Sequence, residues 1–437
     1  MPNETEIEHW LYNCEDCVRT YEIAQIEKAN LKSMGLENVS AAQHALFLPV
    51  LQAMLQGVRI DLEARKEMKN ELEAAIKTRE DFFREVLGHV LNPRSPKQMS
   101  KLFYDDFKLP VIRNRFSGNP TLNEDALTKL SVREPLIKPL VKSINEHRSL
   151  GVFLSTFINA PLDEDSRMRC SYNICGAETY RFSSSENAFG SGTNLQNIPK
   201  GVEAKDPDDL ALPNIRKIFV PDEGYTFFDM DLERADLYVV VWEADDKELK
   251  QVLKEGIDIH EQNSKTLGTS RQLAKSWVHG TNYGGGARTM AQACGITVAH
   301  AESLRKRWFE AHPGILRWHE RVEADLRRTK TVSNKFGYRR FYFDRIEGLL
   351  PEALAWIPQS TVACLINRIW VKAYTKLPGV QILLQVHDSL AGQFSTASLG
   401  DSISGLQECA RISIPYSDPL TIPVNIKTSD KSWGDCD

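Results

Sequence analysis

The 437-residue sequence lacks the marks of membrane-spanning, secreted and disulfide-rich proteins. No run approaches the roughly 18 consecutive apolar residues of a transmembrane helix. The polar, acidic start MPNETEIEHW differs from a secretory signal, and eight cysteines are too dilute for a disulfide scaffold. We therefore expect no membrane partner and a reducing, cytoplasmic location.

The chain also has no net positive charge, no internal repeat and no low-complexity tract. The net charge is −5, so any nucleic-acid surface must be a local groove. Cys14 and Cys17 have the spacing of half a zinc site, but no second pair with such spacing follows, and a tetrahedral site needs four ligands. We interpret this pair as structural.

Apolar periodicity divides the chain into a helical lobe, an α+β core, a helical insertion and a return to the core. It predicts helices over 4–33, from Ser40 to Gly57, from Asp61 to 90, over 121–158 and over most of 247–330. Strands are expected in 167–174, 215–221 and 225–231, with a buried helix over 237–244. Segments 335–343 and 380–394 are typical of β-hairpins, the second turning at His387-Asp388-Ser389.

A basic strip lies in the helical lobe between residues 91 and 115. It contains six cations against two acids: Arg94, Lys97, Lys101, Lys108, Arg113 and Arg115. Such a strip can follow nucleic-acid phosphates, but an ordinary solvated surface has the same composition. The sequence leaves both interpretations open.

Two short strings, DLERAD (231–236) and QVHDS (385–389), each place an aspartate at the tip of an apolar strand. Asp229 and Asp231 share a face because side chains alternate along a strand, and the hairpin can bring Asp388 beside them. A lone acid there is usually a turn residue, but burying two without a cation is costly. Asp231, which Asp236 follows five positions later, and Asp388 are therefore predicted to hold two Mg²⁺ ions for phosphoryl transfer.

A cationic helix lies between these strings, with Ser270 as its expected N-cap. Its stripe recurs every four residues: Arg271, Lys275, His279 and Tyr283. Cations suit phosphates and flat rings suit a sugar or base, and His260 could add a donor. A solvated amphipathic helix would have the same stripe, but Gly280 and 284–286 favour close approach or hinge motion.

With these residues assembled, the chain resembles family A DNA polymerases of the bacterial DNA polymerase I type, particularly phage-encoded members, over roughly 40–437. The matching segments are NPRSPKQMSKLFYDDFKLP, YRFSSSENAFGSGTNLQNIP, the two aspartate strings, the cationic helix, FGYRRFYF and IPQSTVACLINR. The resemblance implies an α+β right-hand fold with an antiparallel palm sheet, helical fingers and a helical thumb. Its implied parts are an exonuclease remnant or connector (1–39), thumb (40–158), palm (159–246 and 346–437) and fingers (247–345).

The resemblance also implies the roles of single residues. Asp231 and Asp388 would bind two Mg²⁺ ions with the Leu232 carbonyl, and Lys275 would also act as general acid. The deoxynucleoside triphosphate would be held by Arg271, Lys275, His260, His279, Tyr283 and Asp236. Primer-template DNA would meet Arg94, Lys97, Lys101, Arg181, Asn194, Gln196, Gln359 and His387.

This chain departs from the family pattern at three positions. The family usually has Glu where this chain has Asp236, the carboxylate that excludes ribose 2′-hydroxyls, and a shorter acid would loosen that gate. His279 replaces Phe or Tyr and adds a titratable donor near the sugar. Ser389 replaces an acid, so a third-carboxylate role is absent.

Tyr12 and Asp16 resemble Y-x3-D, the last motif of the 3′–5′ proofreading domain usually fused upstream, although an ordinary helix can carry the same pair. The earlier acidic motifs are missing, and a two-metal nuclease with one carboxylate cannot hold its ions. We expect no intrinsic proofreading, and either a shortened form or a split polymerase. A separate exonuclease subunit or a processivity factor is then a candidate partner.

The leading interpretation is template-directed DNA synthesis from a primer, with pyrophosphate release, in the host cytoplasm if the chain is phage-encoded. One alternative is a polymerase with relaxed ribonucleotide discrimination, or a single-subunit RNA polymerase. Another is a catalytically silent replisome scaffold that binds primer-template. Intact Asp231, Asp388, Arg271 and Lys275 argue against the scaffold.

Overall fold

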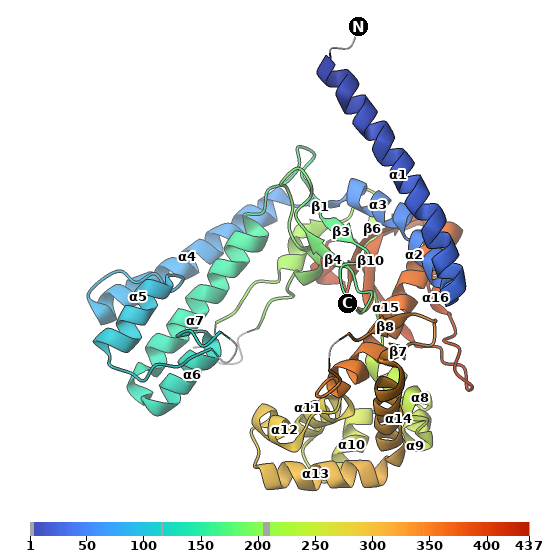
Figure 1. Cartoon of the computed structure of the whole chain (residues 1–437). Coiled ribbons are helices and arrows are strands. Elements are labelled where there is room, and N and C mark those ends of the chain that lie inside the picture. The colour runs from blue at the N-terminus through green and yellow to red at the C-terminus, as the bar shows by residue number, and fades with distance from the viewer. Residues whose placement is uncertain (1–3, 115–116, 204–209, 344, 437) are drawn as a thin grey trace.

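A four-stranded antiparallel sheet lies at the centre of the computed structural model, which describes residues 4–114, 117–203, 210–343 and 345–436. Its strand order is β11-β6-β10-β9, with bounds β6 Tyr225–Leu232, β9 Val380–Val386, β10 Ser389–Ser395 and β11 Val424–Ser429. Helices α15 (Leu350–Lys376), α16 (Leu399–Ala410) and α3 (Phe47–Gln56) share its apolar core. Two helical lobes extend from this centre (Figure 1).

The first lobe is built on the long antiparallel pair α4 (Leu62–Leu87) and α7 (Lys138–Val152). The Asp61 carboxylate caps α4 by accepting from the backbone N–H groups of Glu63 and Ala64, each at 3.0 Å. Shorter helices complete the lobe: α5 Pro96–Ser100, η1 Lys101–Asp106, α6 Glu124–Arg133, η2 Pro135–Ile137 and η3 Phe153–Ile158. The outer part of the lobe has an apolar core of its own around Phe83 and Phe103.

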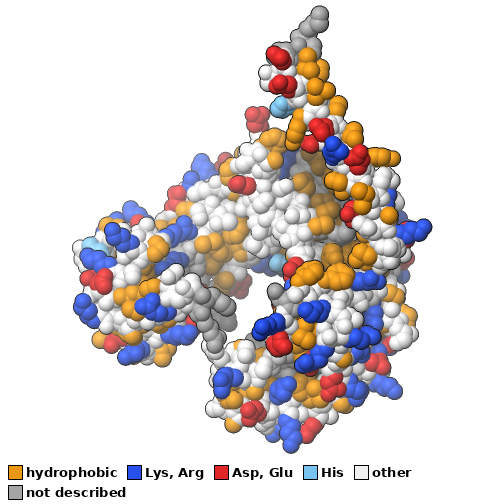
Figure 2. Space-filling model, in the orientation of Figure 1, with side chains coloured by type: hydrophobic (Ala, Val, Ile, Leu, Met, Phe, Trp, Pro, Cys, Tyr) orange, Lys and Arg blue, Asp and Glu red, His pale blue; other side chains and the backbone are white. Residues whose placement is uncertain are grey.

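The second lobe is an insertion between β6 and α15 that consists of helices and then a small hairpin. Its helices are α8 Ala235–Ala244, α9 Lys247–Lys254, α10 Ile259–Leu267, α11 Arg271–Asn282, α12 Ala287–Cys294, α13 Val298–Ala311 and α14 Pro313–Thr329, and its hairpin is β7 Thr331–Ser333 with β8 Arg339–Phe341. Buried Trp277, Trp308 and Trp318 supply much of its packing. The space-filling view shows a wide opening between the two lobes (Figure 2).

Short strands and turns join the first lobe to the sheet. They form the sheet β2-β1-β5, the pair β3-β4 and several 3-10 turns, with bounds β1 Val58–Ile60, β2 Arg167–Met168, β3 Ser171–Asn173, β4 Ser183–Ser185, β5 Phe219–Val220, η4 Leu195–Asn197, η5 Ile215–Ile218, η6 Thr396–Ser398 and η7 Trp433–Asp435. Helices α1 (Glu4–Met34) and α2 (Glu37–His44) precede α3, and α1 projects away from the body (Figure 1).

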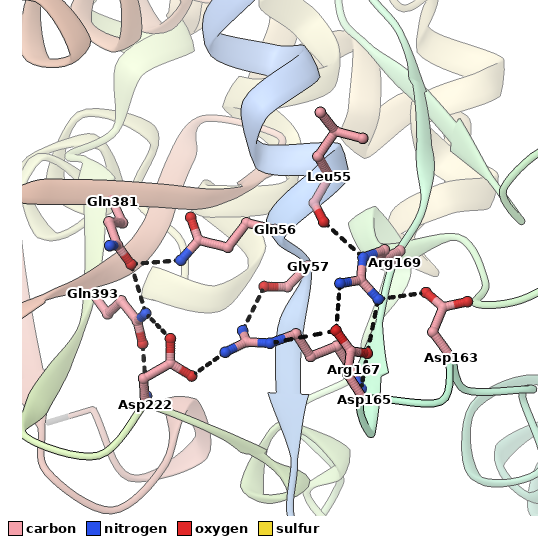
Figure 3. Close-up of polar contacts among 10 residues, drawn as sticks. All are labelled: Leu55, Gln56, Gly57, Asp163, Asp165, Arg167, Arg169, Asp222, Gln381 and Gln393. Atoms are coloured by element: carbon pink, nitrogen blue, oxygen red, sulfur yellow. Dashed lines mark hydrogen bonds and ion pairs between the residues drawn. The ribbon is translucent and has the colours of Figure 1, made fainter.

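A network of buried and half-buried polar side chains holds this junction together (Figure 3). Arg167 of β2 pairs with Asp222 at 2.5 Å, and Gln393 of β10 donates to Asp222 and to Gln381 of β9, each at 2.7 Å. Gln56 of α3 donates to the same Gln381 oxygen at 2.5 Å. The base of the first lobe is therefore tied to the strands that carry the site described below.

Several predicted elements differ in the structure. Ser40 lies inside α2, where its hydroxyl contacts His44 Nδ1 at 3.4 Å, and the expected single helix breaks near Leu46 into α2 and α3. Segment 167–174 divides between two sheets, and 215–218 forms a 3-10 turn because the Asn214 side chain accepts the Arg216 N–H at 3.1 Å. The strands and helices expected at 225–231, 237–244 and 380–394 are present. Within the described residues, no helix has the length and apolar character needed to cross a membrane.

Candidate active site

The two predicted aspartates lie at the same end of neighbouring strands. Asp231 is the next-to-last residue of β6 and faces Ser389 across the ladder, and Asp388 lies in the turn between β9 and β10. The backbone N–H of Leu232 donates to the Asp388 carbonyl at 3.2 Å. His387 adopts a left-handed φ of 57° in this turn, and the Gln385 side chain supports it by donating to the His387 carbonyl at 2.5 Å.

The electrostatic surroundings of Asp231 suit a cation. Burial, followed by the charges of Asp388 and Asp229, raises the pKa of Asp231 to about 6. A divalent cation would favour the ionised carboxylate and offset this repulsion. Among the described residues no group of three or more acidic, His or Cys side chains is placed to hold a metal. Two carboxylates and the Leu232 carbonyl nevertheless fit Mg²⁺, which keeps several waters and also uses substrate phosphates.

Asp229 has a different environment from Asp231. It is 9% exposed, accepts a hydrogen bond from Trp433 Nε1 at 3.0 Å and pairs with Arg216 at 3.6 Å. The Arg216 guanidinium also stacks on the Trp433 ring, 3.9 Å from its centroid. These contacts give Asp229 a structural role and leave Asp231, which is more exposed than Asp229 although partly shielded from solvent, as the better candidate ligand.

A cavity of about 530 Å³ lies between α8, α10, α11 and the β9–β10 turn. Six of the predicted site residues line it: Asp236, His260, Lys275, His279, Tyr283 and Asp388. Burial and the nearby Lys275 charge lower the pKa of His260, which favours the neutral form of this imidazole. The cavity therefore combines acids at its sheet edge with a cation and aromatic rings on α11.

Three of the four stripe residues on and just after α11 line the cavity: Lys275, His279 and Tyr283. Ser270 caps it by accepting the Leu273 N–H at 3.3 Å, and the rings of His279 and Tyr283 meet at 4.9 Å between centroids, edge to face. A Cβ built on Gly280 would lie 2.4 Å from Met290 Sδ. The glycine therefore permits close packing of α12 on α11.

Asp236 connects three segments at the rim of this cavity. Its carboxylate accepts the Tyr283 hydroxyl at 3.3 Å and lies 3.9 Å from Arg181 Nη2. Burial raises the pKa of Asp236, and burial together with this acid raises the pKa of Tyr283. The second carboxylate oxygen is buried without a hydrogen-bond partner among the described residues, so it could receive a donor from a ligand.

Arg271 is placed differently from the rest of the stripe. Its guanidinium binds Asp258 through Nη2 at 2.8 Å and Nε at 3.0 Å, and it is not among the described residues that line the cavity. The Asp258 carboxylate also caps α10 by accepting the His260 N–H at 2.9 Å. This pair and two lining residues, Arg234 and Gln272, were not predicted from the sequence; the position of Arg234 between Asp231 and Asp236 was an available signal.

The residues predicted to meet DNA are distributed over the first lobe, the segment that joins it to the sheet, α15 and the β9–β10 turn. Gln196 donates to Gln385 at 2.7 Å and so connects to the His387 turn, and Asn194 accepts the Ser184 hydroxyl at 2.6 Å. Gln359 is half-buried on α15. Arg94, Lys97 and Lys101 are exposed on the first lobe, and Arg115 lies outside the described residues.

A family model described as DNA polymerase family A matches residues 62–435, most of the chain. The chain belongs to this family. The thermostable DNA polymerase I of Thermus filiformis is 28% identical over 395 residues, covering 85% of this chain and 45% of that protein. Helicobacter pylori DNA polymerase I is 28% identical over 398 residues, covering 86% and 42%. The chain thus spans less than half the length of these curated relatives.

A solved structure shares the family A fold with this chain. It is the POL domain of Pol1 from M. smegmatis in complex with DNA primer-template and dNTP, with a TM-score of 0.77 and 23% identity over 90% of this chain and 70% of that one. The predicted α+β right-hand fold is confirmed. We call the central sheet the palm, the helical insertion the fingers and the first lobe the thumb, after the parts that the resemblance implies.

Proposed function

We propose that this chain is a template-directed DNA polymerase that adds deoxynucleotides to a primer 3′ end and releases pyrophosphate. The observation that carries the proposal is that Asp388 lines a cavity together with Lys275, His279 and Tyr283. Asp231 lies next to it, opposite Ser389 on the neighbouring strand. The DNA polymerase I relatives, and the neighbour described with primer-template and dNTP, support the same activity. The domain limits 1–39, 40–158, 159–246, 247–345 and 346–437 remain part of this proposal.

The chain's own residues would divide the work of the reaction. Asp231, Asp388 and the Leu232 carbonyl would hold two Mg²⁺ ions, which lower the pKa of the primer hydroxyl and neutralise pyrophosphate when bound. Lys275 would bind a phosphate oxygen and protonate the leaving group. Neutral His260 would donate a hydrogen bond to the triphosphate, and Arg271 would reach it after leaving Asp258. His279 and Tyr283 would pack beside the sugar and the template base.

We propose that primer-template DNA lies across the palm between the lobes. Arg181, Gln196, Gln359 and His387 would face its minor groove or backbone with Asn194, and the thumb cations would bind phosphates. The chain would work in the cytoplasm, that of the host if it is phage-encoded. A separate exonuclease subunit or processivity factor would supply functions for which this chain has no complete motif.

Primer extension on a defined template tests the activity. Asp231→Ala and Asp388→Ala should each reduce Mg²⁺-dependent extension by at least about 10³-fold, because each removes a ligand from the reacting centre. Primer-template binding, measured by gel shift, should persist. Asp401→Ala, which removes an exposed acid from α16, is the matched control and should extend normally.

The outcome also separates the alternatives. A wild-type chain that binds primer-template but never extends it would be a scaffold, and extension surviving either catalytic substitution would contradict the metal assignment. Parallel reactions with ribonucleotides test relaxed sugar selection, which the short Asp236 favours. A mismatched primer end tests the predicted lack of proofreading.

A further inference from the structure

Helix α1 carries apolar side chains that the rest of the chain does not cover. Each of its side chains is exposed or half-buried, and the helix projects from the body with apolar atoms along its length (Figures 1 and 2). Eight large apolar residues are 45–67% exposed: Ile7, Trp10, Leu11, Tyr12, Val18, Tyr21, Ile23 and Ile26. Exposed apolar surface on this scale marks an interaction site.

The apolar residues occupy two opposite sides of α1. At 100° per residue, Ile7, Leu11, Val18 and Tyr21 form one face, with Trp10 and the exposed free thiol of Cys14 within it. Tyr12, Ile23 and Ile26 lie on the other side of the helix axis. A two-helix pair would cover one face only. A helix that is apolar on both sides needs an enclosing groove.

The charge of α1 restricts what that groove can be. Residues 4–18 contain five acids and no Lys or Arg. Glu15 lies on the flank between the two apolar faces, where it pairs with Arg19 at 3.5 Å. A parallel second copy would place acid against acid, whereas an antiparallel copy would place these acids against Arg19, Lys28 and Lys32. Either arrangement would still leave one face open. Complementarity instead requires Lys or Arg at the rim of the groove.

The exposed area is sufficient for a specific complex. The three aromatic side chains Trp10, Tyr12 and Tyr21 alone offer on the order of 300 Å², since each such side chain buries about 150–250 Å² when covered. The aliphatic residues bring the helix toward the roughly 800 Å² per partner of a standard interface.

We propose that α1 is a docking helix that inserts into an apolar groove with a basic rim on a second, different protein. The base of α1 is anchored, because Arg339 Nη1 donates to the Met34 carbonyl at 3.1 Å and Tyr338 of the same hairpin donates to Gln43 of α2 at 3.2 Å. A partner bound along α1 would thus lie on the part of the helix that projects from the body (Figure 1). The proposal does not depend on the polymerase assignment.

Sedimentation of the purified chain tests the occupant first. The wild type should be monomeric at about 10 μM, a concentration at which a standard interface between copies would associate. A dimer that dissociates in Leu11→Ser/Val18→Ser would show that a second copy covers α1, and would overturn the proposal.

Two amphipathic 18-residue peptides with the same pattern of apolar and charged positions, one of Leu and Lys and one of Leu and Glu, stand in for the wall of the groove. Their binding to the full chain tests the chemistry of the groove. The Leu/Lys peptide should bind at two sites per chain, one for each face, with an affinity that falls as salt rises. Leu11→Ser/Val18→Ser and Tyr12→Ser/Ile23→Ser should each weaken one site at least 10-fold. Val132→Ser/Leu136→Ser, which changes exposed apolar residues of the thumb, is the matched control and should change neither.

Other results contradict the proposal. Equal binding of the Leu/Glu peptide would show that the groove needs no basic rim. A single binding site that is lost in only one of the two face variants would indicate a two-helix pair. No binding, or binding that all variants retain, would mean that α1 is not a docking surface. Primer extension at the wild-type rate confirms that each variant is folded.

Discussion

Asp236 has one methylene fewer than the glutamate usual in the family. Its carboxylate contacts Tyr283, and both residues line the cavity. The carboxylate meets the Tyr283 hydroxyl at 3.3 Å, a long hydrogen bond, and one of its oxygens is buried without a partner among the described residues. A short acid held back against Tyr283 leaves more room beside a bound sugar.

Asp236→Glu should therefore raise discrimination against ribonucleotides by about 10-fold, or roughly 1.4 kcal/mol. The longer side chain would carry its carboxylate into the space that a 2′-hydroxyl needs. The ratio of kcat/KM for a deoxynucleotide to that for its ribonucleotide is the measurement. Asp236→Asn keeps the size and removes the charge, so it separates bulk from electrostatics. An unchanged ratio in Asp236→Glu would remove this residue from sugar selection.

Asp258 would compete with substrate for Arg271 if this arginine binds the triphosphate as proposed. The Arg271 guanidinium, hydrogen-bonded to Asp258, lowers the pKa of that carboxyl below its usual value, and an exposed ion pair of this kind contributes little to stability because solvent screens it. Asp258→Asn keeps an N-cap oxygen for α10 but frees Arg271. The KM for deoxynucleotide should fall roughly two-fold, with little change in stability. The double variant Asp258→Asn/Arg271→Ala should lose the gain; an unchanged KM in the single variant would show that the pair does not restrain Arg271.

At the scale of elements, the β9–β10 hairpin places Asp388, and Gly392 fixes how closely its strands approach. The register shifts between Ala391 and Gly392, as at a β-bulge. A Cβ on Gly392 would lie 2.1 Å from the Gln381 carbonyl oxygen and 2.9 Å from Ile382 Cα. Both are backbone atoms of β9, which cannot move away as a flexible side chain could.

Gly392→Ala should destabilise the protein by about 2 kcal/mol or more and lower primer extension, because separating the strands displaces Asp388. The midpoint of urea unfolding is the stability measurement. Gly379→Ala is the control, since a Cβ there meets no atom within 4 Å and its φ is not left-handed. Equal midpoints for the two variants would mean that the hairpin tolerates a shift of register.

The elements that could be predicted from sequence are those governed by local chemistry. Ser270 caps its helix as expected, the helix predicted to start at Asp61 begins there, and the apolar run before Asp231 located β6. Long-range packing decided the others. The predicted helix from Ser40 breaks where Leu46 becomes buried in the palm core, and the Arg271–Asp258 pair joins the starts of two helices whose relative positions no local pattern contains.

The whole molecule combines an acidic net charge with a binding surface for a polyanion. At −5, the chain as a whole repels DNA, so attraction must come from the cations near the bound duplex. The thumb carries Arg94, Lys97 and Lys101 exposed on the lobe that faces the fingers across the opening (Figure 2). The salt dependence of binding therefore distinguishes a phosphate-binding strip from an ordinary solvated surface.

Lys97→Ala/Lys101→Ala should reduce the slope of log K against log salt by about 0.9 for each phosphate that a lysine no longer neutralises, measured with primer-template between about 50 and 200 mM salt. Lys306→Ala/Arg328→Ala removes the same charge from α13 and α14, where each cation is exposed and paired with an acid. That control changes the net charge equally but should leave the slope unaltered, because counterion release depends on cations at the phosphates. If both double variants have the wild-type slope, the thumb lysines are only solvated; if both lower it equally, net charge rather than the strip governs binding.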